Sequence, residues 1–149
     1  MSACCISCQG VYNEGMRKIL LSVTALLLAG CCGTSHDAVT DERIEVAIPI
    51  VGQSITSPLE VSGKARGQWF FEATAPISIV DWDGKIIAQS YIQAKDNWMT
   101  EDFVNFEGTI EFEIPADSPS RKGAVIFQRS NPSDLPENAA AVEIPVVFE

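Results

Sequence analysis

Cysteine is absent from most of this 149-residue chain, and histidine is almost absent from all of it. The five cysteines lie within the first 32 residues, and the single histidine is His36. The sequence from Gly33 onward therefore has no disulfide to stabilise it and must fold on its hydrophobic core. His36 stands in a polar segment, so no Ser/His or Cys/His pair is expected inside a folded domain. We expect a protein that is not an enzyme and that needs no cofactor and no metal.

Long apolar runs are missing as well. The longest, residues 19–29, follows Arg17-Lys18 and ends in Leu28-Ala29-Gly30-Cys31. It is about half of the ~20 residues that a membrane-spanning helix needs. A basic head, a short apolar core and small residues before a cysteine are typical of a secretory signal with a lipobox. We predict a signal peptide over residues 1–30 and lipidation of Cys31. An ordinary cleaved signal with a coincidental cysteine is the alternative.

The first fifteen residues leave two interpretations open. Met16 stands directly before the basic pair, so translation starting at Met16 is one interpretation. The other is a metal site built from three early cysteines, Cys4, Cys5 and Cys8. Zinc sites need four ligands at suitable spacing, and the sequence offers only three here. The start at Met16 is therefore favoured.

Charge limits the partners. The formal net charge is −10, and residues 1–30 are slightly basic, so the rest of the chain is more acidic still. An acidic domain repels phosphate backbones, which makes nucleic acid a poor partner. It is also repelled by anionic headgroups, so membrane affinity must come from the N-terminal lipid. We expect an exported, lipid-anchored protein of the cell envelope, with residues 31–42 as the lipidated tether and residues 43–149 as the domain.

Apolar residues of this domain recur with a period of two, which is typical of half-buried strands. Residues 44–50, 110–114 and 142–148 show this alternation. Further strand candidates are residues 59–66, 69–73, 77–82, 85–94 and 124–130. Asp83-Gly84, between two apolar stretches, predicts a short hairpin turn. About seven short strands without a helical stripe predict an all-β, immunoglobulin-like antiparallel β-sandwich.

Several motifs together resemble one known domain. They are Ile48-Pro49, Gly52, ITSPL at 55–59, VSGKARG at 61–67, WFFEA at 69–73, Asp81 with Asp83-Gly84, WMT at 98–100, Phe103, Phe106 and VEIPV at 142–146. This pattern resembles the immunoglobulin-like Gmad domain of bacterial envelope and spore-germination proteins. The resemblance covers about residues 44–148. It implies an immunoglobulin-like sandwich with a role in binding or assembly.

Aromatic and charged residues supply the candidate binding site. Trp98 lies in a predicted loop, where it either closes the end of the sandwich or offers a stacking surface. Trp69 is the second candidate, and beside it Glu72 is expected to form a structural ion pair with Arg66 or Lys64. Asp81 and Asp83 superficially resemble a calcium loop but lack the further oxygen ligands. We therefore expect a domain presented to an envelope protein or a cell-wall glycan, with a tryptophan-based carbohydrate-binding module as the alternative.

Overall fold

The computed structural model describes residues 40–149, and within them it contains nine strands and two short 3-10 helices. The strands are β1 (Thr40–Asp41), β2 (Ile44–Ile48), β3 (Gln53–Ile55), β4 (Leu59–Arg66), β5 (Thr74–Asp81), β6 (Ile86–Ala94), β7 (Phe103–Ile110), β8 (Lys122–Gln128) and β9 (Ala141–Phe148). The 3-10 helices are η1 (Gly67–Trp69) and η2 (Pro136–Asn138). The expected signal peptide and Cys31 lie outside the described residues.

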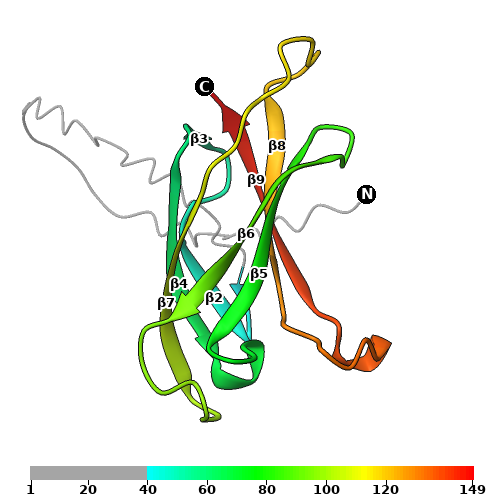
Figure 1. The fold of residues 1–149 in the computed structure, drawn as a ribbon. Coiled ribbons are helices and arrows are strands. Elements are labelled where there is room, and N and C mark those ends of the chain that lie inside the picture. The colour runs from blue at the N-terminus through cyan, green and yellow to red at the C-terminus, as the bar shows by residue number, and fades with distance from the viewer. Residues whose placement is uncertain (1–39) are drawn as a thin grey trace, which may run out of the picture. The chain divides into compact units, whose positions relative to one another are not determined.

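Hydrogen bonds connect the strands in the order β1-β2-β4-β7-β6-β5-β8-β9-β3. The link between β6 and β7 is short, only three residue pairs, and there the sheet folds over on itself. Two layers result, β1-β2-β4-β7 and β6-β5-β8-β9-β3, as Figure 1 shows. Every pairing is antiparallel except that of β3 with β9. The predicted all-β sandwich is confirmed.

β2 and β3, near the start of the domain, join different layers. β2 pairs with β4, and its register shifts between Val46 and Ile48. Pro49 follows outside any ladder, and the Gly52 amide donates to the Pro145 carbonyl as β3 joins β9. In β9, the Phe148 amide donates to the Arg121 carbonyl, so Pro145, three residues earlier, turns its missing N–H away from β8. Both prolines thus occupy positions that need no ladder hydrogen bond.

The core lies between the layers and takes one face of each long strand. Phe106 on β7 and Phe127 on β8 meet across it, with ring centroids 5.9 Å apart. Ile44 and Val46 are buried, and β9 alternates buried and exposed residues along most of its length, as predicted. Ile48 and Ile50 were predicted to continue the buried face of Ile44 and Val46, but they are exposed, because the register of β2 shifts after Val46 and the strand ends at Ile48. Other core side chains are Ile55, Val61, Ile77, Ile79, Ile92, Val104, Ile110, Val125 and Ile144.

The strand predicted over residues 69–73 is wrong. The chain forms η1 there, and then turns back so that Phe71 and Thr74 exchange two N–H···O bonds of 3.0 Å. The two residues between them, Glu72 and Ala73, have φ of 51° and 63°. Trp69 and Phe70 are both buried, which a strand cannot do with one buried face because its successive side chains point to opposite faces.

The strand predicted over residues 110–114 is also displaced. β7 ends at Ile110, and the residues after it pair with no strand. Phe112 is nevertheless buried, its amide donates to Ser57 Oγ at 3.0 Å, and its ring lies 5.6 Å from that of Phe148. The alternation therefore reported burial correctly but could not report whether a neighbouring strand was available.

Candidate functional site

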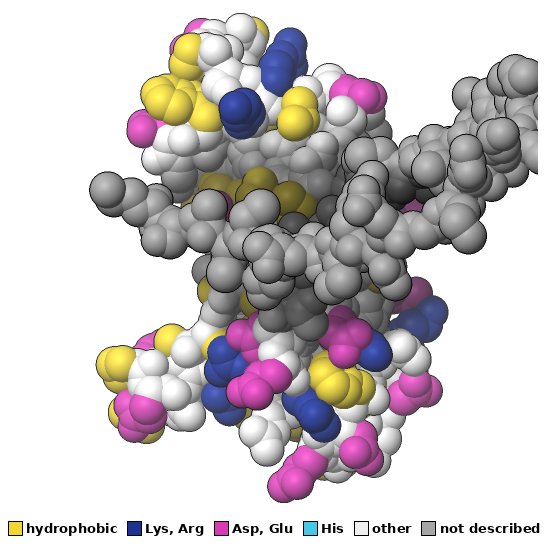
Figure 2. Space-filling model, turned by 180° about the vertical axis from the view of Figure 1, so that it is seen from behind, with side chains coloured by type: hydrophobic (Ala, Val, Ile, Leu, Met, Phe, Trp, Pro, Cys, Tyr) yellow, Lys and Arg dark blue, Asp and Glu magenta, His cyan; other side chains and the backbone are white. Residues whose placement is uncertain are grey.

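Charged side chains of both signs share the surface of the described residues. Figure 2 shows acidic and basic groups intermixed at the end that carries η1 and η2, the lower part of the view. Ser78 is the only polar side chain classed as buried among residues 41–149. Within the described part of the chain, no group of three or more His, Cys, Asp or Glu side chains is arranged to hold a metal ion. No helix in residues 40–149 is long and apolar enough to span a membrane.

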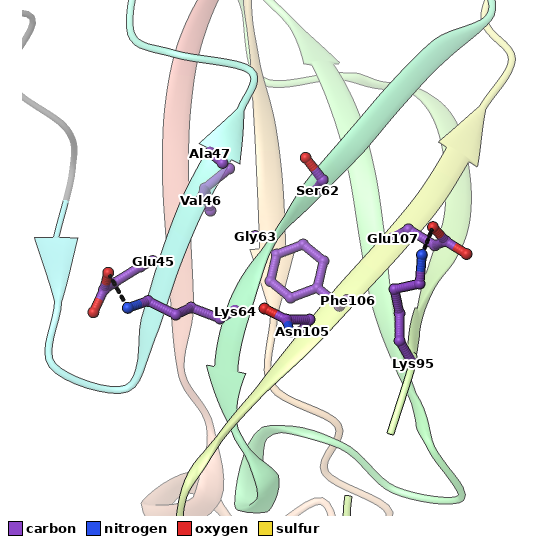
Figure 3. Close-up of a pocket in the computed structure, with 10 residues that line it drawn as sticks. All are labelled: Glu45, Val46, Ala47, Ser62, Gly63, Lys64, Lys95, Asn105, Phe106 and Glu107. Carbon is purple, nitrogen blue, oxygen red and sulfur yellow. Dashed lines mark hydrogen bonds and ion pairs between the residues drawn. The ribbon is translucent and has the colours of Figure 1, made fainter. Parts of the chain in front are cut away.

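One hollow, about 550 Å³, lies on the outer face of β2, β4 and β7 (Figure 3). Ion pairs flank it, Lys64 with Glu45 at 3.0 Å and Lys95 with Glu107 at 2.6 Å. All four side chains are substantially exposed, so these pairs contribute little stability. Their charges are already matched within the protein. This surface therefore offers a solvated polar face without an obvious charge preference.

The floor of this hollow is bare backbone at Gly63. A Cβ at this position would collide with the Glu45 carbonyl oxygen and lie 2.8 Å from Phe106 Cζ. Gly63 thus lets the Phe106 ring pack directly beneath β4, where any side chain would force the strands apart.

A second hollow, about 360 Å³, lies at the end of the domain where β4 stops, and we call it the arginine pocket. Its lining includes three of the four arginines of residues 40–149, and the fourth, Arg121, lies elsewhere. The lining residues are Glu42, Arg43, Arg66, Gln68, Trp69, Glu101 and Arg129. They come from four separate segments of the chain, so this pocket exists only in the folded domain.

Arg43 is already paired within the protein. Its Nε and Nη2 atoms donate to the two carboxylate oxygens of Asp41 at 3.0 and 2.9 Å. This hydrogen bonding lowers the pKa of the Asp41 carboxyl below its ordinary value and raises the pKa of Arg43. The Arg43 guanidinium also lies 6.0 Å from the centre of the Trp69 ring. Arg43 is therefore held at the wall of the pocket with its charge balanced.

Arg66 and Arg129 are held differently. Arg66 Nη1 donates to the Glu101 carbonyl at 3.2 Å, and its guanidinium carbon stands 4.3 Å from the Phe103 ring centre. Arg129 Nε donates to the Gln68 carbonyl at 2.9 Å. Within residues 40–149, neither guanidinium has a carboxylate at ion-pair distance. Arg66 is oriented by a backbone and a ring contact and Arg129 by a backbone contact, and among the described residues neither charge is compensated by a carboxylate at short range.

The structure brings together two of the four predicted binding residues of the domain, Trp69 and Arg66. Trp69 is only 1% exposed, so it forms the wall of the pocket and offers no surface for stacking. Trp98 is half-buried and packs against the core. Glu72 lies exposed in the turn after η1 and makes no ion pair within the described residues. The predicted ion pair is therefore wrong, because Lys64 pairs with Glu45 and Arg66 stacks on Phe103.

Sequence reasoning missed Arg43 and Arg129 as members of the pocket. A usable signal existed for Arg43, because antiparallel pairing of the first two long strands places the start of one beside the end of the other. The Arg66 amide indeed donates to the Arg43 carbonyl at 2.8 Å. Arg129 follows β8 in the opposite layer, and no local pattern links it to the others.

The hairpin tip, residues 82–85, forms as predicted, with φ of 81° at Gly84. One carboxylate oxygen of Asp81 accepts hydrogen bonds from the amides of Asp83 at 3.0 Å and Lys85 at 2.9 Å. Asp81 therefore stabilises the turn, as Asp side chains commonly do. Trp82, which sequence reasoning did not select, is 53% exposed there and is the most exposed of the three tryptophans.

Comparison with family models gives one match. Residues 43–134, from Arg43 to the segment that follows β8, match Gmad2, described as the immunoglobulin-like domain of bacterial spore germination. Comparisons with curated proteins and with solved structures give no match. The match covers more than half of the chain and agrees with the two-layered antiparallel sandwich. The chain belongs to the Gmad2 family of immunoglobulin-like domains.

Proposed function

We propose that this protein is a non-enzymatic binding module of the cell envelope, tethered to a membrane by lipid on Cys31. The observation that carries the proposal is the sequence Leu28-Ala29-Gly30-Cys31, which follows a short apolar run. Only eight residues separate Cys31 from Thr40, where β1 begins. Such an arrangement is typical of a lipid-attached domain held close to its membrane.

Binding is favoured over catalysis by the state of the charged groups. Catalytic acids, bases and nucleophiles are usually desolvated and have strongly shifted pKa values. Here every charged side chain in residues 41–149 retains solvent exposure. The carboxyl with a shifted pKa, Asp41, is shifted by a surface ion pair with Arg43. These features support a surface for recognition.

The carbohydrate alternative depends on the tryptophans. Sugar stacking needs an exposed tryptophan ring, and an exposed, coplanar pair of rings would favour it most. Trp69 is buried and Trp98 is half-buried, whereas Trp82 stands on the hairpin tip at the other end of β5. Trp82 would have to act without a second tryptophan. A partner recognised through polar groups is therefore favoured over a glycan recognised by paired tryptophans.

Lipid labelling tests the tether. The full chain is expressed in a bacterial host with a radioactive or clickable fatty acid, beside Cys31→Ser and the matched control Cys32→Ser. We expect label and membrane retention in the wild type and in Cys32→Ser, and loss of both in Cys31→Ser. Retained label in Cys31→Ser, or an unlipidated mature N-terminus beyond residue 31 by mass spectrometry, contradicts the proposal.

A further inference from the structure

We propose that the arginine pocket binds a single carboxylate group of a partner molecule. The inference rests on the proposed binding role, because it names the ligand chemistry that such a module recognises. The pocket concentrates three guanidinium groups, from Arg43, Arg66 and Arg129, in a chain whose net charge is −10. Cationic groups gathered in one hollow of an acidic protein mark the place where an anion would be held.

Two of these arginines present unused donors in fixed directions. Arg66 is oriented by Phe103 and the Glu101 carbonyl, and Arg129 by the Gln68 carbonyl. Within residues 40–149, both Nη groups of Arg129, and Nε and Nη2 of Arg66, donate to no protein acceptor. A planar fork of N–H donors matches the two oxygens of a carboxylate, and prior orientation reduces the entropy lost on binding.

The backbone around the pocket is connected across long sequence separations. The Gly67 amide donates to the Asp102 carbonyl at 3.1 Å, and the Ser130 amide donates to the Trp69 carbonyl at 2.9 Å. These bonds join η1 to the β6–β7 loop and to the segment after β8. The buried Trp69 ring fills the space behind them. The walls are therefore set by the fold before a ligand arrives.

The balance of charge selects the kind of anion. Asp41 balances the charge of Arg43, and the other charged residues that line the pocket are Arg66 and Arg129 with Glu42 and Glu101, so the pocket has no large excess of positive charge. A monoanion therefore meets less repulsion from the two glutamates than a phosphate, which carries more negative charge near neutral pH. The volume of about 360 Å³ is at the lower end of the range for small-molecule sites. A carboxylate on a group the size of an amino acid fits both limits.

The test compares an acid with its uncharged analogue. The full chain, labelled with ¹⁵N and held in nonionic detergent at constant ionic strength, is titrated with N-acetylalanine and separately with N-acetylalaninamide. The arginine Nε–H and tryptophan indole N–H signals are followed. We expect saturable shifts of the Arg66, Arg129 and Trp69 signals with the acid and none with the amide. Equal responses to both compounds, or no response to the acid, overturn the proposal.

Variants locate the site. Arg66→Gln and Arg129→Gln should each weaken binding of the acid by about tenfold or more, since hydrogen bonds to charged groups are strong. Arg121→Gln, which removes the arginine outside the pocket, should leave the affinity unchanged. Unaltered affinity in both pocket variants overturns the assignment. Should either glutamine variant fail to fold, Arg66→Lys and Arg129→Lys keep the charge but remove the fork and should also weaken binding.

Two further ligands test which kind of anion the pocket accepts. Glucuronate, a sugar acid, should bind if the carboxylate alone is recognised, and inorganic phosphate should bind more weakly than N-acetylalanine. Tighter binding of phosphate overturns the monoanion assignment. None of these titrations requires lipid on Cys31. Failure of the lipid labelling with success of the titration therefore rejects the tether and keeps the pocket, and the reverse outcome rejects the pocket alone.

Discussion

The arginine-pocket end of the domain and the hairpin tip are built on opposite principles. At the pocket end, hydrogen bonds join residues far apart in sequence, such as Ser130 with Trp69 and Arg129 with Gln68. At the hairpin tip, the bonds of Asp81 with Gly84 and Lys85 span at most four residues. The tryptophans follow this division, because Trp69 is buried and Trp82 is exposed. A tip formed by local bonds tolerates change, whereas the pocket depends on the whole fold.

The largest expected effect is at Trp69. Trp69→Ala removes a ring that is 1% exposed and should lower the free energy of unfolding by about 3–5 kcal/mol. Denaturant unfolding followed by circular dichroism measures the loss. Trp69→Phe serves as the control, because it keeps an aromatic ring and should lose clearly less. A loss below about 1 kcal/mol for the alanine variant would remove the contrast between the two ends.

Trp98 should come second. It packs against the core but is only half-buried, so Trp98→Ala should lower the free energy of unfolding by about 2–3 kcal/mol, less than full burial would give. The same denaturant experiment applies. An unchanged midpoint would show that Trp98 is not needed to close the arginine-pocket end of the domain. The stacking-surface interpretation of its ring would then return.

The turn at Glu72–Ala73 predicts a stabilising change. Ala73 has φ of 63°, which costs a non-glycine residue about 1–2 kcal/mol. Ala73→Gly relieves this cost but adds freedom to the unfolded chain, so we expect a net gain of about 0.5 kcal/mol. Ala47→Gly, in the exposed part of β2, is the control and should lose about 0.5–1 kcal/mol. Destabilisation of both variants by equal amounts would contradict the assigned turn.

Acid should weaken the Asp41–Arg43 pair. The pKa of Asp41 is lowered in the folded state, so its contribution is present above the unfolded pKa of about 3.9 and is lost as pH falls through the folded pKa. Solvent screening limits the contribution to about 0.5 kcal/mol. Unfolding free energies of the wild type and Asp41→Asn should differ at pH 7 and converge near pH 2. Arg43→Gln should remove the same pH-dependent part, and a pH-independent difference would refute the explanation.

The smallest effect is expected at the hairpin tip. Trp82→Ala removes an exposed ring held in a locally bonded turn, and it should change the free energy of unfolding by no more than about 0.5 kcal/mol. Thermal and denaturant unfolding measure this. A loss comparable to that of Trp98→Ala would mean that both ends depend on their tryptophans, and the division between them would fail.

The same division separates what sequence reasoning could predict from what it could not. Local signals sufficed for the hairpin at Asp83-Gly84, and β4 was predicted with its observed bounds. The period of two also reported the burial of Phe112 correctly. Sequence reasoning failed where tertiary packing overrides the pattern. Trp69 and Phe70 both turn inward, so the strand predicted over residues 69–73 does not form. β7 was not predicted as a strand; it contains Gly108, whose backbone packs close against β6.

The arginine pocket illustrates the limit for sites. Arg66 was chosen from the sequence as a possible ion-pair partner of Glu72, but its neighbours in space come from other segments. Arg129 belongs to the opposite layer, and only the folding over of the sheet brings it to this end. A site assembled by long-range connections has no short motif, so periodicity and spacing carry little information about it.

The position of β1 sets how far the pocket can travel from a membrane. β1 pairs with the start of β2, and Arg43 and Glu42, which connect them, line the arginine pocket. Eight residues stand between Thr40 and Cys31, and a fully extended chain covers about 3.5 Å per residue. If Cys31 carries the lipid as proposed, the start of β1 stays within about 30 Å of the lipid-attached residue. The pocket would then reach only molecules close to the membrane surface, so its carboxylate partner would have to lie at that surface.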